Sequence, residues 1–222
     1  CRRAGGRRCG VSDLGGAYDR VRAQVETSPL PAGSGHVVGP AELAVAATYV
    51  AYGGDGWREL GPALEEALDH HDGSALWELA QSYYDFGGYG VYAAVVCADT
   101  PPPADPAAWK AFADHARAIS PRFGGSVANE LLPCATWPVR SSTVPAPITA
   151  PGTPPVLVVG NTGDPATPYA NAQAVAAHLA SAVLVTADID GHTAYGADDC
   201  VTRLVDRYLV DRTVPPTGTR CG

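Results

Sequence analysis

PVLVVGNTGDPATPYANAQAVAAHLASAVLVTADIDGHTAYG occupies residues 155–196 and holds two short apolar runs on either side of an alanine-rich segment. The runs at 156–159 and 182–185 are continuous and rich in β-branched residues, which is typical of strands buried on both faces of a parallel sheet. Between them, Pro168 is expected to open a helix that Thr167 caps. The apolar stripe of this helix consists of Ala172, Val175, Ala176 and Leu179. The stretch therefore predicts a βαβ unit.

Helical patterns lie on both sides of this unit. After it, a helix is predicted whose apolar face consists of Val201, Leu204, Val205 and Tyr208. Before it, residues 1–137 predict short amphipathic helices broken by Gly and Pro, and Asp105 with Pro106 predicts the start of the last one. The stripes of these helices are Leu14, Ala17, Tyr18, Val21 and Val25; Leu43, Ala46, Ala47 and Val50; Trp57, Leu60, Leu64 and Leu68; and Trp109, Phe112, Ala113 and Ala116. The segment at 138–155 is rich in Pro, Ser and Thr and is expected to run extended between the two regions.

The charge balance argues against a nucleic-acid partner. The formal net charge is −8 and the single lysine is Lys110, whereas phosphate binding needs clustered cations. One local basic cluster consists of Arg2, Arg3, Arg7 and Arg8. A solvated surface loop is the simpler interpretation of that cluster. No apolar run approaches the length of a membrane span.

The six cysteines indicate an oxidising, secretory compartment. They include no CxxC pair, so disulfides fit better than a zinc ribbon, although buried free thiols in a cytosolic protein remain the alternative. About fifteen pairings are possible. Sequence proximity favours Cys1 with Cys9, Cys97 with Cys134, and Cys200 with Cys221. Because the chain lacks Met and begins at Cys1, we expect a mature, cleaved or truncated product.

Two polar residues follow the predicted strands. Asp164 lies in the loop after the first strand, and Pro165 biases it toward an extended conformation. His192 lies in the loop after the second strand, beside Gly191. An aspartate and a histidine on adjacent strand exits, in that order, match the second and third members of a Ser-Asp-His triad. The simpler alternatives are a turn-capping aspartate and a hydrogen-bonded loop histidine.

The motifs GDPATP at 163–168 and GHTAYG at 191–196 resemble the C-terminal region of the secreted bacterial tripeptidyl-aminopeptidase-like hydrolases. The resemblance covers residues 155–221, and the strings CAD at 97–99, SPRFG at 120–124 and LPCATWPV at 132–139 resemble the helical lid of that family. It implies an α/β protein, the C-terminal portion of an α/β-hydrolase fold. Residues 1–150 would form the helical lid with its Pro-rich return linker, and residues 151–222 would carry the catalytic Asp164 and His192.

The family's nucleophile is not found in this sequence. Members carry a GxSxG elbow in an N-terminal half, and no GxSxG occurs here. The nearest string, GGSVA at 124–128, lacks the final Gly and follows a helical stretch. We therefore reject Ser126 as the nucleophile and expect the serine in an N-terminal half that is absent from this chain.

Residues for substrate and cofactor binding are less evident. An aminopeptidase must hold a cationic α-amino group, and Glu130 and Asp99, which lie near the two lid cysteines, are the candidates; ordinary surface acids are the alternative. Aromatic residues between 83 and 92 could line a pocket, but packing inside the lid is the preferred interpretation. The residues are Tyr83, Tyr84, Phe86, Tyr89 and Tyr92. His70, His71 and Asp72 fall at a predicted helix C-terminus and give little support for a metal, and no cofactor is expected.

The sequence thus predicts part of a secreted serine exopeptidase that cleaves peptides from the N-terminus through an acyl-enzyme. The nucleophile would come from the missing N-terminal half. An esterase on the same fold is one alternative. A stand-alone, non-catalytic binding module is another. It would not explain why Asp164 and His192 follow adjacent strands.

Overall fold

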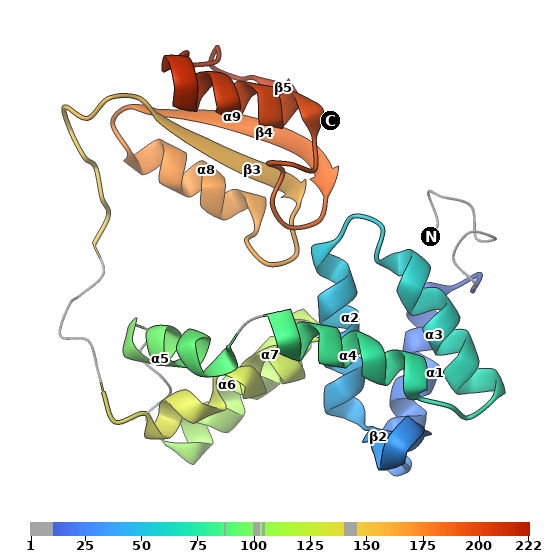
Figure 1. Ribbon diagram of the computed structural model, residues 1–222. Coiled ribbons are helices and arrows are strands. Elements are labelled where there is room, and N and C mark those ends of the chain that lie inside the picture. Colours follow the sequence, from blue (N-terminus) through green and yellow to red (C-terminus); the bar gives the residue numbers. More distant parts are fainter. Residues whose placement is uncertain (1–10, 87, 100–102, 104, 140–145) are drawn as a thin grey trace. The chain divides into compact units, whose positions relative to one another are not determined.

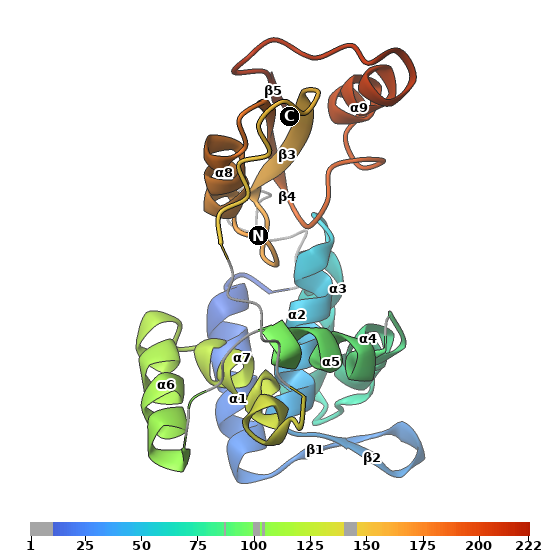
Figure 2. The ribbon, with the colours of Figure 1, turned by 90° about the vertical axis from the view of Figure 1, so that its left-hand side faces the viewer.

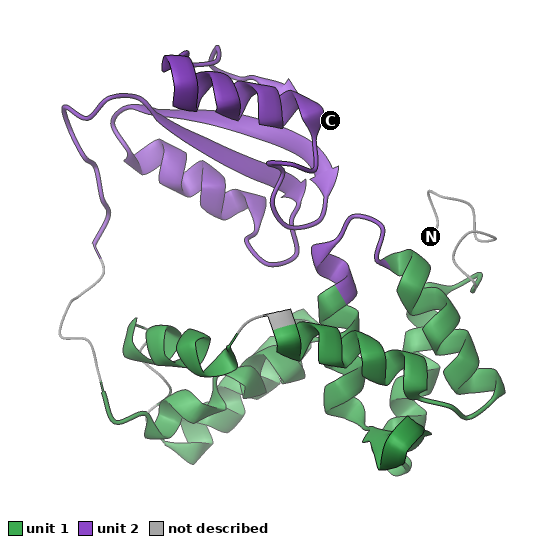
Figure 3. Ribbon diagram, in the orientation of Figure 1, with its two compact units in different colours: residues 1–49, 57–144 green, residues 50–56, 145–222 purple. Residues whose placement is uncertain are grey.

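The computed structural model describes residues 11–99, except 87, then 103, 105–139 and 146–222. The chain divides into two compact units (Figure 3). Unit 1 contains residues 1–49 and 57–144, and unit 2 contains residues 50–56 and 145–222. Unit 2 therefore includes a short segment from the first half of the sequence.

Unit 1 is built mainly from helices (Figure 1). The α-helices that begin in it are α1 (Leu14–Thr27), α2 (Pro40–Tyr52), α3 (Trp57–Asp69), α4 (Ser74–Phe86), α5 (Tyr89–Asp99), α6 (Pro106–Ile119) and α7 (Gly124–Glu130). Two 3₁₀ turns are η2 (Gly33–Gly35) and η3 (Leu132–Thr136). The strands β1 (Leu30–Ala32) and β2 (His36–Val38) form an antiparallel hairpin. The sequence patterns did not predict this hairpin, because strands of three residues are too short to show an alternation.

The helical periodicity of unit 1 is confirmed. The buried face of α1 consists of Ala17, Tyr18, Val21 and Val25. The stripe predicted for α2 is buried throughout, and Leu60 and Leu64 are buried in α3. The carboxylate of Asp105 accepts a hydrogen bond from the backbone N–H of Ala108 at 2.8 Å, so it caps α6 as predicted. Only Phe112 departs from its stripe and is exposed, since Trp109 and Ala113 fill the buried face of α6.

A disulfide joins Cys97 of α5 to Cys134 of η3. Both cysteines are buried together with Ala93, and Leu131 and Trp137 pack against them. This cross-link closes a loop of 37 residues. The predicted pair of Cys1 and Cys9 lies outside the described residues.

Unit 2 is a three-stranded parallel sheet with a helix on each face (Figure 2). Its elements are β3 (Val156–Gly163), α8 (Tyr169–His178), β4 (Ala182–Asp190), α9 (Asp199–Asp211) and β5 (Arg220–Cys221). The strand order is β3-β4-β5, and Val156 lies opposite Ala182. The fold is therefore α/β, consistent with the C-terminal part of an α/β-hydrolase, as the sequence predicted.

The core of unit 2 is small and lies between β4 and α9. It consists of Val185, Ala187, Ala194, Val201 and Cys221. A second disulfide, between Cys200 and Cys221, joins the start of α9 to β5. No helix in the described part of the chain is long and apolar enough to cross a membrane.

Several local predictions about unit 2 are wrong. Val175 belongs to the apolar stripe predicted for the helix after the first strand, but it is 49% exposed, and no residue of α8 is buried. The runs at 156–159 and 182–184 are only half-buried, because β3 pairs with β4 alone and β5 pairs with β4 only at Thr186 and Ala187 in the described sheet. Thr167 does not cap the following helix, which begins at Tyr169. Its hydroxyl instead donates a hydrogen bond to the carboxylate of Asp164 at 2.9 Å.

Candidate active site

The structure brings Asp164 and His192 together in unit 2. Asp164 directly follows β3, and His192 lies two residues beyond the end of β4. Because the two strands are parallel neighbours, their carboxyl ends meet at one edge of the sheet. The Nδ1 atom of His192 lies 3.0 Å from Oδ2 and 3.1 Å from Oδ1 of Asp164.

Hydrogen bonds within a turn hold the carboxylate of Asp164 in place independently of His192. The backbone N–H groups of Ala166 and Thr167 each donate to Oδ1 at 2.8 Å, and the Thr167 hydroxyl donates to Oδ2. The side chain is 5% exposed. Asp164 thus caps a turn, as the simpler interpretation held, and also contacts the histidine.

The electrostatic balance keeps Asp164 ionised. Burial alone would raise the pKa of its carboxyl group. The hydrogen bonds from Thr167, Ala166 and His192 outweigh that effect and hold the pKa below its ordinary value of 3.8. The residue therefore faces His192 as a charged acceptor at neutral pH.

The imidazole of His192 is held in one orientation. Its Nδ1 must carry the proton in order to donate to the carboxylate, which leaves the Nε2 lone pair free to accept a proton. The ring of Tyr52 meets the imidazole edge-on, with centroids 5.3 Å apart. The side chain of His192 is 30% exposed, so a reacting group has access to it. This is the arrangement that a general base requires.

A cavity of about 420 Å³ lies beside the pair, within unit 2. Its polar wall includes Asn161, Asp164 and His192. Its apolar wall includes Val159 and Ala194. A mostly apolar cavity with a few convergent polar groups is the usual form of a binding site.

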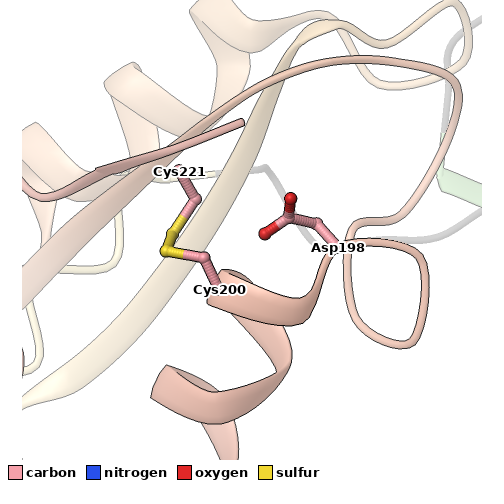
Figure 4. Close-up of side chains that lie close together, drawn as sticks. All are labelled: Asp198, Cys200 and Cys221. Atoms are coloured by element: carbon pink, nitrogen blue, oxygen red, sulfur yellow. A yellow bond between two sulfur atoms is a disulfide. The ribbon is translucent and has the colours of Figure 1, made fainter.

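In the described part of the chain, a disulfide takes up the sulfur atoms of one group of potential metal ligands. Asp198, Cys200 and Cys221 lie close together (Figure 4). However, the two sulfur atoms are joined in a disulfide, and a metal needs free thiolates. Asp198 caps α9 by accepting from the backbone N–H of Val201 at 2.8 Å.

The structure places His70, His71 and Asp72 at and just beyond the end of α3. His70 follows the last residue of α3. The side-chain amide of Gln24 donates to Nδ1 of His71 at 2.6 Å. Asp72 accepts hydrogen bonds from the backbone N–H and the hydroxyl of Ser74.

The two candidate amine-binding acids, Glu130 and Asp99, lie in unit 1 and differ in their surroundings. Glu130 ends α7 and is half-buried. Burial raises the pKa of its carboxyl group, and a hydrogen bond from Tyr92 offsets part of this rise. The hydroxyl of Tyr89 donates to the Glu130 carbonyl at 2.8 Å. Asp99 ends α5 and is exposed.

Two further interpretations concern unit 1. The hydroxyl of Ser126 donates to the Phe123 carbonyl inside α7, and this helical position differs from a strand-to-helix elbow. The aromatic side chains were expected to pack inside the lid. For Tyr84, Tyr89 and Tyr92 this is wrong: they are 47%, 48% and 44% exposed. Beside α5, the local core is filled by Ala93 and the Cys97–Cys134 disulfide instead.

Sequence reasoning missed two residues beside His192. Asn161 is 4% exposed, and its Nδ2 donates to the Gly191 carbonyl at 3.0 Å. The carbonyl of Tyr52 accepts a hydrogen bond from the backbone N–H of His192 at 2.8 Å. A polar residue at the end of an apolar strand was a visible signal for Asn161. Nothing in the sequence near Tyr52 indicates its contact with a residue so far along the chain.

Comparisons with known proteins show what this chain is similar to. Residues 120–221 match the family model described as TAP-like protein. Over 178 residues the chain is 38% identical to carboxylesterase B of Mycobacterium tuberculosis, a match that covers 74% of this chain and 34% of the relative. Serine protease Hip1 of Mycobacterium tuberculosis is 34% identical over 178 residues, with the same coverage of 74% and 34%.

A third relative is the tripeptidyl aminopeptidase of Streptomyces lividans. It is 31% identical over 200 residues, which are 86% of this chain and 36% of the relative. The chain thus spans about a third of the length of the curated relatives that it matches.

Proposed function

Residues 120–221 are a C-terminal TAP-like region of the α/β-hydrolase fold, and from that premise we propose that this chain supplies the base and the acid of a secreted serine exopeptidase. The hydrogen-bonded pair of Asp164 and His192 at two neighbouring strand ends carries the proposal. A charged carboxylate beside Nδ1 gives the imidazole the tautomer that accepts a proton at Nε2. A non-catalytic binding module would have no use for a histidine whose tautomer is set by a charged carboxylate.

The reaction would proceed through an acyl-enzyme. A serine hydroxyl attacks the scissile carbonyl carbon while Nε2 of His192 takes its proton. The tetrahedral intermediate collapses, the C–N bond breaks, and His192 returns the proton to the leaving amine. Water then attacks the acyl-enzyme by the same steps, which releases the peptide acid and restores the serine. Asp164 stays ionised and stabilises the imidazolium throughout.

The serine would come from an N-terminal half outside this sequence. The edge of β3 supports this part of the proposal. The strand is apolar and only half-buried, and its outer edge is unpaired within the described sheet. An upstream strand that pairs there would bury the run at 156–159 and bring its own carboxyl end next to Asp164.

We assign residues 1–150 to a lid with its return linker and residues 151–222 to the catalytic sheet. Within the lid, Glu130 and Asp99 are the proposed anchors for the α-amino group of a peptide. A half-buried carboxylate such as Glu130 gains most from an ammonium partner, because the ion pair compensates its desolvation. The two disulfides suit secretion into an oxidising compartment.

An esterase is the second candidate. The observation that favours it is the 38% identity to a protein named carboxylesterase B. The same acid and base serve amide and ester substrates, so the pair of Asp164 and His192 does not discriminate between them.

The test joins the chain to the segment that its gene encodes upstream. The product is offered a tripeptide p-nitroanilide with a free N-terminus, its N-acetylated form, and p-nitrophenyl acetate. We expect cleavage of the free peptide, little cleavage of the acetylated form, and loss of activity in His192→Ala. The Ser126→Ala variant is the matched control and should keep full activity. Turnover of the ester alone would favour the esterase, and absence of all three activities would contradict both enzymatic proposals.

A further inference from the structure

We propose that Asn161, Gly54 and the carbonyl of Tyr52 are positioning groups that fix the peptide bond between Gly191 and His192 and thereby aim the imidazole. The inference rests on the proposed function, in which His192 is the base. It goes further by naming what holds that base in place.

Both polar atoms of this one peptide group are engaged. Its carbonyl, from Gly191, accepts from Nδ2 of Asn161 at 3.0 Å. Its N–H, from His192, donates to the carbonyl of Tyr52 at 2.8 Å. A peptide group is planar, so two hydrogen bonds from opposite sides set the rotation of the whole plane. The direction of the His192 side chain follows from that rotation.

Asn161 also connects the base to the acid. It lies on β3, three positions before Asp164, and its amide is buried. The backbone N–H of Gly191 donates to the carbonyl of Gly163, which lies next to Asp164, at 3.2 Å. The end of β3 therefore holds the loop of His192 at two points and fixes its distance from Asp164. Burying a polar amide is unfavourable without such a partner, and Asn161 has one here.

The turn after α2 packs closely against the same loop. Gly191 has a φ of +107°, and a Cβ atom there would lie 3.0 Å from both the Gly54 nitrogen and the Tyr52 carbonyl oxygen. A Cβ atom on Gly54 would lie 2.9 Å from the carbonyl oxygen of Asp190. The neighbouring Gly53 has free space around the same added atom. Thus the close contact between the turn after α2 and the loop of His192 requires a glycine at position 54 but not at position 53.

The first experiment removes the donor of Asn161. In the protein that carries its nucleophile, Asn161→Leu keeps a similar volume and cannot hydrogen-bond to Gly191. We expect kcat to fall roughly 10- to 100-fold with KM nearly unchanged, because the base is misaligned while the substrate still binds. Thr186→Val is the matched control: Thr186 is also a buried polar residue of unit 2, and its hydroxyl lies 2.6 Å from that of Tyr169. This control should keep kcat.

A second measurement does not depend on turnover. In protein labelled with ¹⁵N-histidine, the His192 resonances are assigned by comparison with His192→Ala. The Nδ1 proton shared with Asp164 should shift or broaden in Asn161→Leu and stay in place in Thr186→Val. Unchanged His192 resonances together with an unchanged kcat would overturn the inference.

The third experiment changes the turn after α2, which contacts the Gly191–His192 peptide on the side away from Asn161. It compares substitutions of the two adjacent glycines of that turn. Gly54→Ala should displace the loop of His192, lower kcat and shift the same proton. Gly53→Ala should leave both at the wild-type value. Equal effects of the two substitutions would mean that the turn stabilises the fold without aiming the base. If wild-type protein cleaves no substrate, the proposed function fails, whereas the Nδ1 proton signal still decides whether Asn161 and Gly54 position His192.

Discussion

The Nδ1 atom of His192 lies 3.0 Å from Oδ2 of Asp164, although 28 positions separate the two residues in the sequence. The register of two parallel strands accounts for this proximity, since β3 and β4 pair from Val156 and Ala182 up to their carboxyl ends. The pair is held from both sides: a turn satisfies the carboxylate of Asp164, and hydrogen bonds fix the peptide before His192. In the proposed reaction, side chains held in this way would lose little freedom when a substrate reacts.

The role of Asp164 can be separated from substrate binding. Asp164→Asn keeps the shape of the side chain but removes the charge that fixes the tautomer of His192. We expect kcat to fall by roughly 10³- to 10⁴-fold with KM close to wild type. Steady-state kinetics on the joined protein measure both. Asp188→Asn, an exposed carboxylate on the neighbouring strand that pairs with Arg220, is the control. Near wild-type turnover of Asp164→Asn would assign the role to another carboxylate.

Asp164 should also make stability depend on pH. Its pKa is lower in the folded chain than its ordinary value of 3.8, so the folded state favours the ionised form. This stabilisation is fully present above the unfolded pKa and is lost as pH falls through the folded pKa. The free energy of unfolding should therefore decrease more steeply below about pH 4 in wild type than in Asp164→Asn. Urea unfolding at a series of pH values measures the difference, and parallel curves would contradict the expectation.

The disulfides should be present in protein made in an oxidising compartment. Non-reducing digestion and mass spectrometry should recover Cys97 with Cys134 and Cys200 with Cys221, and the sequence also predicts Cys1 with Cys9. Replacing Cys200 and Cys221 together by serine should lower the free energy of unfolding by about 2–4 kcal/mol, because α9 is no longer tied to β5. A free, alkylatable Cys97 would show that no disulfide braces α5.

The unpaired edge of β3 should make the chain associate when it is alone. Exposed amides and carbonyls along an apolar strand are a template for other chains. We expect aggregates in size-exclusion chromatography and no hydrolysis, and we expect the co-expressed N-terminal half to restore both solubility and activity. A monodisperse, cooperatively unfolding monomer of the isolated chain would instead favour an independent module.

Local patterns predicted much of the fold. The periodicity of α1 and the cap at Asp105 depend on residues within a few turns of each other, and both were confirmed. The same reasoning was wrong for the run at 156–159 and for the exposed tyrosines. An apolar strand or an aromatic helix face indicates that a residue can be buried, but the neighbour that would cover it is set by the rest of the fold.

The sequence by itself determined the βαβ unit and the two loops that hold Asp164 and His192, because the apolar runs and the Pro and Gly beside these residues are properties of short segments. Tertiary structure alone decided what fixes the orientation of His192. The carbonyl of Tyr52 and the side chain of Asn161 meet the peptide of His192 from distant parts of the chain. Backbone carbonyls are the same in every residue, so a contact made by one leaves no trace in the sequence and becomes visible only when the chain has folded.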